Sequence, residues 1–597
     1  MIRIPNKNKQ FSVDNASFSR GNIYSTWNVM FDADIGKIKL NPPLLHSYFT
    51  SGGNGFSNPI AIVVAPTDFS DRGAVTDGYI LTDDGAGFGG VWKTSGGLGQ
   101  ITQTNSPSKA TDATSDMCLY LGAQSTEKIY VSDADGLHNC KPANSNDTWV
   151  ALDGSTTSAT ASKNAFILIP FTYNNRLYMI PSTANAIYSI QETSDGTFSV
   201  PVSNGSSFSI NTGLSGITCG RASSKRIWFA SSSSNTGKSK VYEWDGVQAN
   251  LPLNVYNIDV PLIQSIAILN DTPVCIDGRG RLWFFDGYQF VLKSGINFPS
   301  REDNVEQTCT VHRNGMITDK GKLYVNIGNV SSTMYRNSTE RSLAGVWCYD
   351  PAIGFYHFSS PENISRVTAP YCLARWVADQ TFAVGFKGTT GSVTDTVYNV
   401  AVTNTDETLG GTLRLGFLTT QFMESQNLTD MWNSVGIKYR DMIYASAKVE
   451  VKYRFKKNIE CNTTITWTSA TTFTCPTANL AGSGFYYNTQ VVVGDEVMVQ
   501  QGVNSGLIAH ITTMVDGGTD TTVTIDRSAT TTSGTSYAMF SNYALLGTIT
   551  KDGDTFKNFR LAKKSTMIQV KLVMSWVGYY DEIQEILLSE QKQDSTI

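Results

Sequence analysis

The sequence predicts an all-β protein, in which an irregular β-propeller of about six or seven blades is followed by a C-terminal β-sandwich that carries an inserted small β-barrel. Three observations lead to this prediction. Short β-prone bursts recur around Asp-Gly-type turns as far as about residue 405, and a stricter polar–apolar alternation replaces them beyond it. A Thr- and Gly-rich segment with its own alternation then interrupts this second part.

The repeats are bursts such as YILTDDGAGFGGVW, VYEWDGVQANL and RLWFFDGYQFVL, each of which enters and leaves a glycine-containing turn. Their spacing averages about 50 residues, a period typical of propellers and arrays. A further strand pair precedes several turns, as NNRLYMIP precedes AIYSIQ, so each period holds about four strands, the content of one propeller blade. The turn glycines are Gly85, Gly136, Gly196, Gly246, Gly287 and Gly354, with Gly36 as a possible seventh.

Two alternatives compete with this interpretation of the repeats. Gly85, Gly87 and Gly90 fit the G-x-G-x-x-G pattern of dinucleotide-binding folds, which requires a helix after the glycines. A Val-Trp-Lys run follows instead and favours a strand, so we interpret the stretch as strand, turn and strand. A β-solenoid is the second alternative, but its rungs are much shorter than about 50 residues.

The chain divides into four predicted parts. They are an N-terminal segment with the first strands (1–56), the propeller (57–405), the sandwich (406–458 and 550–597) and the inserted barrel (459–549). Because insertion at an exposed loop is well tolerated, we expect the rest of the chain to fold without the barrel. The segment DEIQEILLSEQKQ near the C-terminus predicts the one convincing short helix.

The sandwich prediction depends on segments such as AKVEVKYRFKK, which alternates cleanly between apolar and charged residues, and TMIQVKLVMSW, which alternates in a similar way. Such a strand has one face toward the core and one toward water. We interpret the charged side of the first segment as a solvated face rather than a nucleic-acid patch. The residues expected on this wet face are Lys448, Glu450, Lys452 and Arg454.

Composition limits the function classes. Over 597 residues, 41% are hydrophobic and only 16% charged, with a formal net charge of -5. So few cations argue against a protein that grips nucleic acid through a basic surface. No secretory signal and no long apolar run are present, so we expect no membrane segment. The nine cysteines lie singly, which excludes a zinc framework or a disulfide scaffold; Cys461 and Cys475 remain a possible pair.

A search for chemistry nominates no catalytic, cofactor-binding or metal-binding residue, and the sequence predicts a protein that is not an enzyme. Nucleophile-elbow, Walker and zinc-protease motifs are missing. Asp133 and Asp135 beside Gly136 form only a fragment of a calcium loop, and two turns loosely resemble the Asp-box of sialidase-like propellers. The histidines, which we expect to be structural, are His46, His138, His312, His357 and His510.

The chain resembles the tail nozzle or packaged-DNA stabilisation (tail hub) proteins of short-tailed bacteriophages. The resemblance rests on the propeller followed by KVEVKYRF and MIQVKLVMSWVGYYDEIQEILL, and on the N-terminal DADIGKIKLNPPLL. The insert's VVVGDEVMV and GLIAHIT resemble small barrels of phage virion proteins. The barrel is not a required part of that family, so its role stays open: docking a fibre, contacting the host cell surface or thickening the ring.

The resemblance implies a structural virion protein located in the phage tail. Such a protein would form a ring, expected to be a homohexamer, that extends the portal and adaptor channel, retains packaged DNA and passes it during ejection without sequence-specific binding. Its partners would be copies of itself, the portal or adaptor proteins, and tail fibres or spikes. The competing class is a tail-associated propeller that binds or hydrolyses glycans, and a free carbohydrate-binding module is a third possibility.

Overall fold

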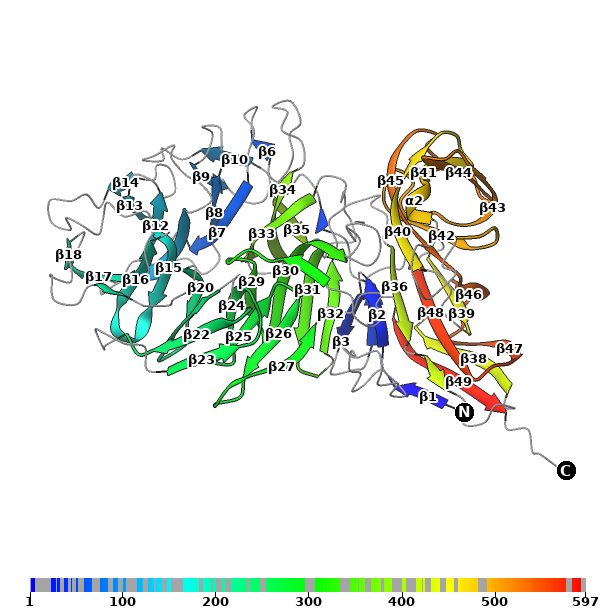
Figure 1. Ribbon diagram of the computed structural model, residues 1–597, viewed down its shortest axis with the longest axis horizontal. Coiled ribbons are helices and arrows are strands. Elements are labelled where there is room, and N and C mark those ends of the chain that lie inside the picture. The colour runs from blue at the N-terminus through cyan, green and yellow to red at the C-terminus, as the bar shows by residue number, and fades with distance from the viewer. Residues whose placement is uncertain are drawn as a thin grey trace.

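A computed structural model shows three β-structured parts side by side (Figure 1). The propeller lies at one end of the long axis, a two-sheet sandwich at the other, and a small barrel beside the sandwich. The structure describes the strands named below and the stretches 115–121, 165–181, 216–232, 237–246, 254–295, 307–332, 344–352, 354–359, 422–424, 431–440, 447–455, 460–480, 491–575 and 582–591. The remaining residues, mostly between strands, lie outside this description.

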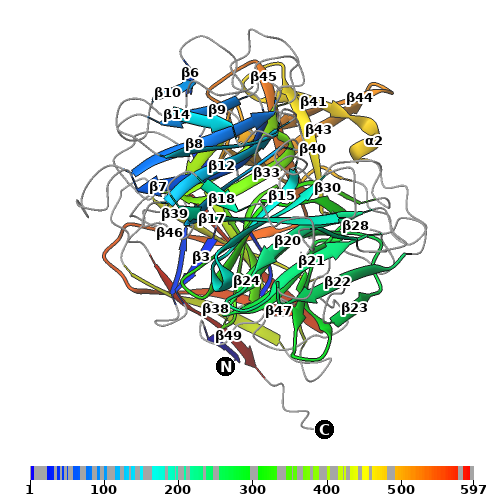
Figure 2. The ribbon, with the colours of Figure 1, turned by 90° about the vertical axis from the view of Figure 1, so that its left-hand side faces the viewer.

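The propeller has seven blades within the described residues, each a sheet of four or five strands. The innermost strand of each blade contacts the innermost strands of its two neighbours, and the last contacts the first, so the ring is closed. Several of these strands converge near the middle of the view in Figure 2. The inner strands are β7 (Asn58–Pro66), β11 (Asp116–Leu121), β15 (Ala165–Phe171), β20 (Ile217–Ala222), β24 (Ile263–Leu269), β29 (Met316–Asp319) and β33 (Val367–Trp376).

The other strands complete the blades by antiparallel pairing, apart from one short parallel edge pair in blade 1. Blade 1 adds β8 (Thr76–Asp83), β9 (Gly90–Thr94), β10 (Gln100–Gln103) and β6 (Thr50–Ser51); blade 2 adds β12 (Glu127–Asp133), β13 (Gly136–Lys141) and β14 (Thr148–Ala151); blade 3 adds β16 (Arg176–Pro181), β17 (Ala186–Ser194), β18 (Thr197–Ser199) and β19 (Ser207–Ser209), with the short 3-10 helix η1 (Thr172–Asn174); blade 4 adds β21 (Ile227–Ser231), β22 (Ser239–Trp244) and β23 (Asn254–Ile258); blade 5 adds β25 (Thr272–Asp277), β26 (Arg281–Phe285) and β27 (Phe290–Gly295); blade 6 adds β28 (Gln307–Thr310), β30 (Lys322–Ser332), β31 (Gly345–Asp350) and β32 (Gly354–Ser359); blade 7 adds β34 (Thr381–Gly388), β35 (Val400–Thr403) and β5 (Leu44–Leu45).

The ring is closed by a strand from the N-terminal segment. β5 pairs with β35 as the outer strand of blade 7, and β6 adds to the edge of blade 1. The segment 1–56, predicted as a separate part, is therefore divided between the propeller and the sandwich. Blade 7 therefore combines strands from before and from the end of the repeat region, and the backbone hydrogen bonds between β5 and β35 close the ring. Local sequence patterns do not show this pairing.

The Asp-Gly turns join strands within blades. Gly246 and Gly287 have φ of 76° and 102°, which glycine adopts without strain. The Asp286 carboxylate accepts the backbone N–H groups of Tyr288 and Gln289, both at 2.9 Å, and so fixes one such turn. The G-x-G-x-x-G stretch lies between the antiparallel strands β8 and β9, as predicted, although residues 84–89 lie outside the described residues. Gly36 lies between sandwich strands, so its turn does not belong to a seventh blade.

The sandwich packs two six-stranded sheets face to face. Sheet A has the order β3 (Val29–Asp32), β4 (Lys37–Leu40), β49 (Ile583–Gln591), β38 (Met431–Tyr439) and β47 (Phe556–Lys564), with β1 (Ile2–Pro5) beside β49. Sheet B has the order β2 (Ile23–Trp27), β36 (Leu415–Thr420), β48 (Met567–Ser575), β39 (Lys448–Arg454) and β46 (Ala544–Thr550), with β37 (Met423–Glu424) beside β48.

Three predictions about this region are wrong. The segment predicted as a helix forms β49, because β38 pairs along one of its edges while β1 and β4 pair along the other, and tertiary pairing overrides a weak helix propensity. β46, which the predicted boundaries placed in the barrel, pairs with β39 in sheet B. The charged side of β39 also faces protein rather than water, as described below.

The inserted barrel is closed, in the order β40 (Glu460–Trp467), β41 (Thr472–Pro476), β44 (Asp520–Ile525), β43 (Ile508–Asp516), β42 (Glu496–Gly502) and β45 (Gly534–Ser541). A single helical turn, α2 (Thr477–Leu480), follows β41. Apolar side chains that include Phe473, Val497 and Phe540 fill its interior. The all-β class with propeller, sandwich and barrel is therefore confirmed.

The three parts are joined by buried apolar contacts. One hydrophobic cluster contains Tyr356 of blade 6, Phe382 of blade 7 and Trp432 of sheet A, so the propeller and sandwich share a core. A second cluster joins Phe417 of sheet B to Met539 of the barrel.

Candidate functional site

The centre of the propeller holds a cavity of about 460 Å³, lined by residues on or next to the inner strands of all seven blades. Its walls are mostly apolar, with Ile62, Met117, Ile169, Ile268 and Leu373 among the lining residues. This volume lies within the usual range of small-molecule sites, roughly 300–1,000 Å³. Propeller axes are natural places for such a site, because every blade contributes one strand to the wall.

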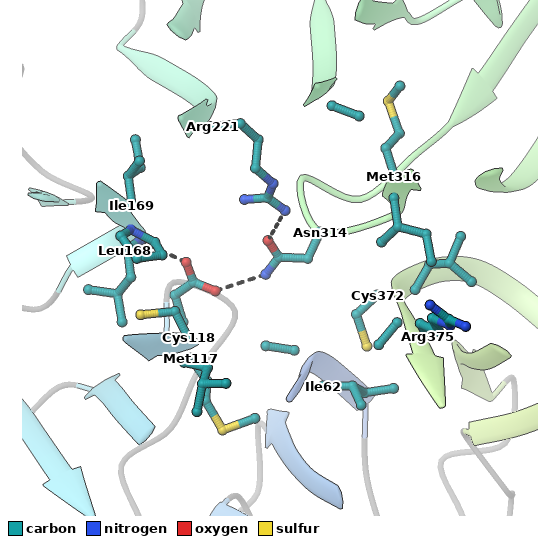
Figure 3. A pocket seen from close by; sticks show the side chains of 18 of the residues that line it. Ile62, Met117, Cys118, Leu168, Ile169, Arg221, Asn314, Met316, Cys372 and Arg375 are labelled. Carbon is teal, nitrogen blue, oxygen red and sulfur yellow. Dashed lines mark hydrogen bonds between the residues drawn. The ribbon is translucent and has the colours of Figure 1, made fainter. Parts of the chain in front are cut away.

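A turn of blade 6 enters this central space. Thr310 of β28 pairs with Gly328 of β30, and Met316 of β29 pairs with Val325 of β30. Between these two pairs the inner side of the blade advances by six residues, whereas β30 advances by only three. The extra residues, 311–315, leave the ladder between β28 and β29 and form a turn at the axis. Figure 3 shows Asn314 at its tip, between Arg221 on one side and Arg375 on the other. We call residues 311–315 the axial turn.

Asn314 ties the axial turn to four blades. Its side-chain amide donates to Asp116 Oδ1 at 2.8 Å and to the Ile60 carbonyl at 3.2 Å, in blades 2 and 1. Its Oδ1 accepts from Arg221 Nη2 of blade 4 at 2.9 Å, and its backbone carbonyl accepts from the Leu373 N–H of blade 7. A single asparagine therefore uses both amide donors and its acceptor to hold the blades around the axis.

Arg313 adds two further connections. Its Nη2 donates to the Ser115 carbonyl at 2.6 Å, and its own carbonyl accepts from the Ser265 hydroxyl of blade 5 at 2.8 Å. The second Asp116 oxygen accepts the Leu168 N–H of blade 3 at 2.8 Å. The axial turn thus reaches every other blade, directly or through Asp116.

Two arginines, Arg221 and Arg313, lie beside or within the axial turn. Arg221 is linked through Asn314 to Asp116, a carboxylate that is 2% exposed, and Arg313 donates to the carbonyl of Ser115, the residue before it. Burial and the neighbouring Arg313 and Arg221 cations hold the pKa of His312 well below its usual value, so this imidazole is neutral. The cavity mouth lies where Thr318 is exposed and where Arg375, paired with Asp319 at 3.0 Å, is 46% exposed.

A second polar cluster lies between sheet B and the barrel, on the side of β39 predicted to face water. Lys452 of β39 and Lys571 of β48 are directly opposite each other, each 1% exposed. Two like charges in that register repel unless they are neutralised. Glu450 lies 2.9 Å from Lys452, and Glu496 of the barrel pairs with Lys452 and lies 3.7 Å from Lys571. The barrel thereby supplies a counter-charge that the sandwich needs.

Arg454, also predicted to be solvated, is buried in the same interface. Its Nε donates to Gln569 Oε1 at 2.6 Å, and its guanidinium lies 4.3 Å from the ring centroid of Tyr543. The wet-face prediction failed because alternation shows that a strand has two different faces but does not show what covers the polar one.

Other residues weighed in the sequence do not come together. His138 and His357 are buried in different blades, His510 pairs with Asp526 on the barrel, and His46 lies outside the described residues. Asp133 begins the β12–β13 turn, while Asp135 lies outside the description. Cys461 and Cys475 are both free thiols. In the described part of the chain, no group of three or more His, Cys, Asp or Glu side chains could hold a metal ion.

The axial residues carry no signal that sequence reasoning could have used. VHRNGM contains an Asn-Gly pair, which predicts a turn, but nothing local shows that this turn points along the axis. Asp116, Arg221 and Asn314 belong to three blades, so only the closed ring brings them together.

Comparison with known proteins identifies no family and no curated protein that matches the chain. Similar solved structures include BBS1N in complex with ARL6DN, 10% identical over 59% of this chain and 92% of that chain, with a TM-score of 0.34. BamB from Moraxella catarrhalis is 8% identical over 58% of this chain and 97% of that chain (TM-score 0.29). YCF48 from Cyanidioschyzon merolae is 11% identical over 58% of this chain and 95% of that chain (TM-score 0.34). None of the helices in the described residues has the length and apolar character needed to cross a membrane.

Proposed function

We propose that this chain is a structural subunit of a bacteriophage tail, which assembles with copies of itself into a ring that extends the portal and adaptor channel. In the virion the ring retains packaged DNA and passes it during ejection. The sequence resemblance to tail nozzle proteins motivates the proposal. The proposed partners are a homohexameric ring of this chain, the portal or adaptor, and tail fibres or spikes.

The observation that carries the proposal is the joining of three β parts by buried contacts. A hydrophobic cluster continues from blades 6 and 7 into the sandwich, and another continues from the sandwich into the barrel. Domains that move relative to one another usually meet through smaller and more polar interfaces. A subunit whose parts are joined in this way transmits force instead of hinging, as a channel wall under DNA pressure requires.

Within this proposal, sheet A is the part that faces DNA. Exposed cations are concentrated on and just after β38 and along β47: Lys438, Arg440, Arg560, Lys563 and Lys564. A modest cation stripe would contact phosphates transiently and in a salt-dependent manner, without reading sequence. Replacing these residues with glutamine should weaken retention of packaged DNA at low salt while leaving ring assembly intact.

Mass spectrometry and electron microscopy of purified particles test the proposal. We expect the chain in virions at a copy number matching a closed ring below the portal, and immunogold label at the tail. Absence from particles, or presence only on detached fibres, would show that the proposal is wrong.

The second candidate is a glycan-binding or glycan-hydrolysing propeller, which the axial cavity favours. Incubation of the protein with host polysaccharide, followed by measurement of reducing ends, separates the two functions. Released sugar would favour the enzyme, whereas retention of labelled polysaccharide without release would favour a binding module.

A further inference from the structure

We propose that the protein forms an internal amide bond between the Lys452 side chain of the sandwich and the Glu496 side chain of the barrel, with Glu450 as the proton carrier. The two reacting groups already form a buried ion pair, so the step needs no further reactant. This inference depends only on the interface between sheet B and the barrel, and it is independent of the tail proposal.

The reacting pair is enclosed by protein. Lys452 Nζ pairs with Glu496 Oε2, and the two side chains are 1% and 0% exposed. Keeping such a charged pair away from water is costly, because both ions lose their hydration. The amide that replaces the pair is uncharged, and the water molecule that is released returns to the solvent. Burial therefore favours the amide, whereas the same two groups on a wet surface would stay ionised.

The neighbours of Glu496 give its two oxygens different roles. Oε1 accepts a hydrogen bond from the Ser541 hydroxyl at 3.3 Å and lies 3.7 Å from Lys571 Nζ. A hydrogen-bond donor and a cation at one oxygen stabilise the negative charge that develops there when a nucleophile adds to the carboxyl carbon. Oε1 is therefore the oxygen that remains as the amide carbonyl. Oε2, which is paired with Lys452, is the oxygen that leaves.

Glu450 lies in position to carry the proton. Its Oε2 is 2.9 Å from Lys452 Nζ, and its side chain is 2% exposed. Burial by itself would raise the pKa of Glu450, but Lys452 and Lys448 outweigh burial and lower this pKa, so Glu450 is a carboxylate that can accept a proton. Burial lowers the pKa of Lys452 to about 8. A fraction of this amine is therefore neutral near pH 7, and a neutral amine is the nucleophile that the step requires.

The step balances within the chain. The Lys452 ammonium transfers one proton to Glu450, and the lone pair of the neutral nitrogen forms a bond to Glu496 Cδ. The bond between Cδ and Oε2 then breaks, while Oε2 takes up the proton from Glu450 and a second proton from the nitrogen. One ammonium and one carboxylate thus give one amide and one water, without oxidation or reduction and without a change in net charge. The amide keeps one N–H, which the Glu450 carboxylate can still accept.

Mass spectrometry of the denatured full chain tests the proposal directly. We expect an intact mass that is one water below the mass of the sequence. Trypsin should then fail to cut after Lys452, and fragment 449–454 should be recovered joined to fragment 458–527, which contains Glu496. The pair of Lys557 and Asp552, 3.0 Å apart but 33% and 28% exposed, is the control within the same digest. It should remain an ion pair, so trypsin should cut after Lys557.

Three variants assign the roles. Lys452→Arg keeps the positive charge without a side-chain amine, and it should show the full mass of its sequence. Glu450→Gln removes the proton carrier, so the joined fraction should fall by at least about tenfold at matched times after synthesis. Lys557→Arg is the matched lysine control and should be joined to the same extent as the parent. A parent chain with the unmodified mass, trypsin cleavage after Lys452, or a lost water that maps to other residues would each overturn the proposal, and an unchanged joined fraction in Glu450→Gln would overturn the role of Glu450.

Discussion

Asn314 and Asp116 lie 198 positions apart in the sequence, yet the Asn314 amide donates to the Asp116 carboxylate at 2.8 Å beside the propeller axis. The same asparagine accepts from Arg221, so a three-residue chain of hydrogen bonds connects blades 2, 6 and 4. Polar groups buried at the axis of a β-propeller must be satisfied by one another, and here one turn from blade 6 performs that function.

Replacing Asn314 with alanine should destabilise the propeller. The substitution leaves the buried Asp116 carboxylate without its side-chain donor and removes the acceptor of Arg221, which together cost about 2–3 kcal/mol. Urea unfolding followed by tryptophan fluorescence measures the change. Asn254→Ala is the control, because that amide bonds to Glu243 at an exposed position and its loss should change stability by less than about 0.5 kcal/mol. Equal effects of the two substitutions would contradict a structural role for the axial turn.

The protein should lose stability as the pH falls below 6.5. Burial lowers the pKa of His357 to about 4, while the unfolded chain titrates near its ordinary value of 6.5. A lowered histidine pKa means that the unfolded state binds the proton first, so stability is complete above pH 6.5 and is lost on the way to pH 4, by about 3 kcal/mol. His312, whose pKa is also lowered, acts in the same direction.

His357→Gln isolates this contribution, because the amide can still donate to the Ala344 carbonyl, which lies 3.3 Å from His357 Nε2. Chemical unfolding at pH 7 and at pH 4.5 should show a smaller loss for the variant than for the parent. An identical pH dependence in both would mean that His357 does not titrate in this range.

The sequence was sufficient for the features that are local or periodic. Asp-Gly turns predicted blade hairpins because a turn such as Asp286-Gly287 is fixed by its own side chain and its own φ. The barrel was visible because its strands alternate within one continuous segment. The helix prediction at β49 failed because strands distant in sequence, β1, β4 and β38, determine that structure.

The candidate site could not be predicted because none of its parts is meaningful alone. Arg221 is one cation in a strand and Asp116 one acid at the start of another; their relation exists only after seven blades close into a ring. The same limit applies to Lys452 and Lys571, whose buried position depends on a barrel inserted between them in the chain. Sequence patterns show which residues share a face, and the fold determines what that face meets.

Replacing Glu450 with glutamine should destabilise the sandwich–barrel interface by about 3 kcal/mol, because Lys452 and Lys448 lose a buried or half-buried partner. Burial opposes the charge of Glu450, but Lys452 and Lys448 outweigh it and lower its pKa. A lowered carboxylate pKa stabilises the fold above about pH 4.5, and the contribution is lost as the pH falls through the folded value. Asp552→Asn, which breaks a more exposed pair with Lys557, should change stability by less than about 1 kcal/mol. Differential scanning calorimetry compares the stability of the two variants. An unchanged stability of Glu450→Gln would show that the buried pair does not stabilise the fold.

The contacts between sheet B and the barrel argue against the expectation from the sequence that the rest of the chain folds without the barrel. Deleting the barrel, with residues 460–541 replaced by a short Gly-Ser linker, should not leave an intact sandwich. The deletion exposes Leu415, Phe417 and Val573, which pack against the barrel, and each buried apolar side chain contributes about 1.5–3 kcal/mol. It also removes Glu496, which neutralises the opposed lysines. The shortened chain should bind a hydrophobic dye and melt below the parent. Adding Phe417→Ser and Val573→Thr to the deletion should restore solubility, because water then meets polar side chains where the barrel had been. If the simple deletion is as soluble as the parent and melts at the same temperature, the barrel is an independent appendage and its contacts with sheet B do not stabilise the fold.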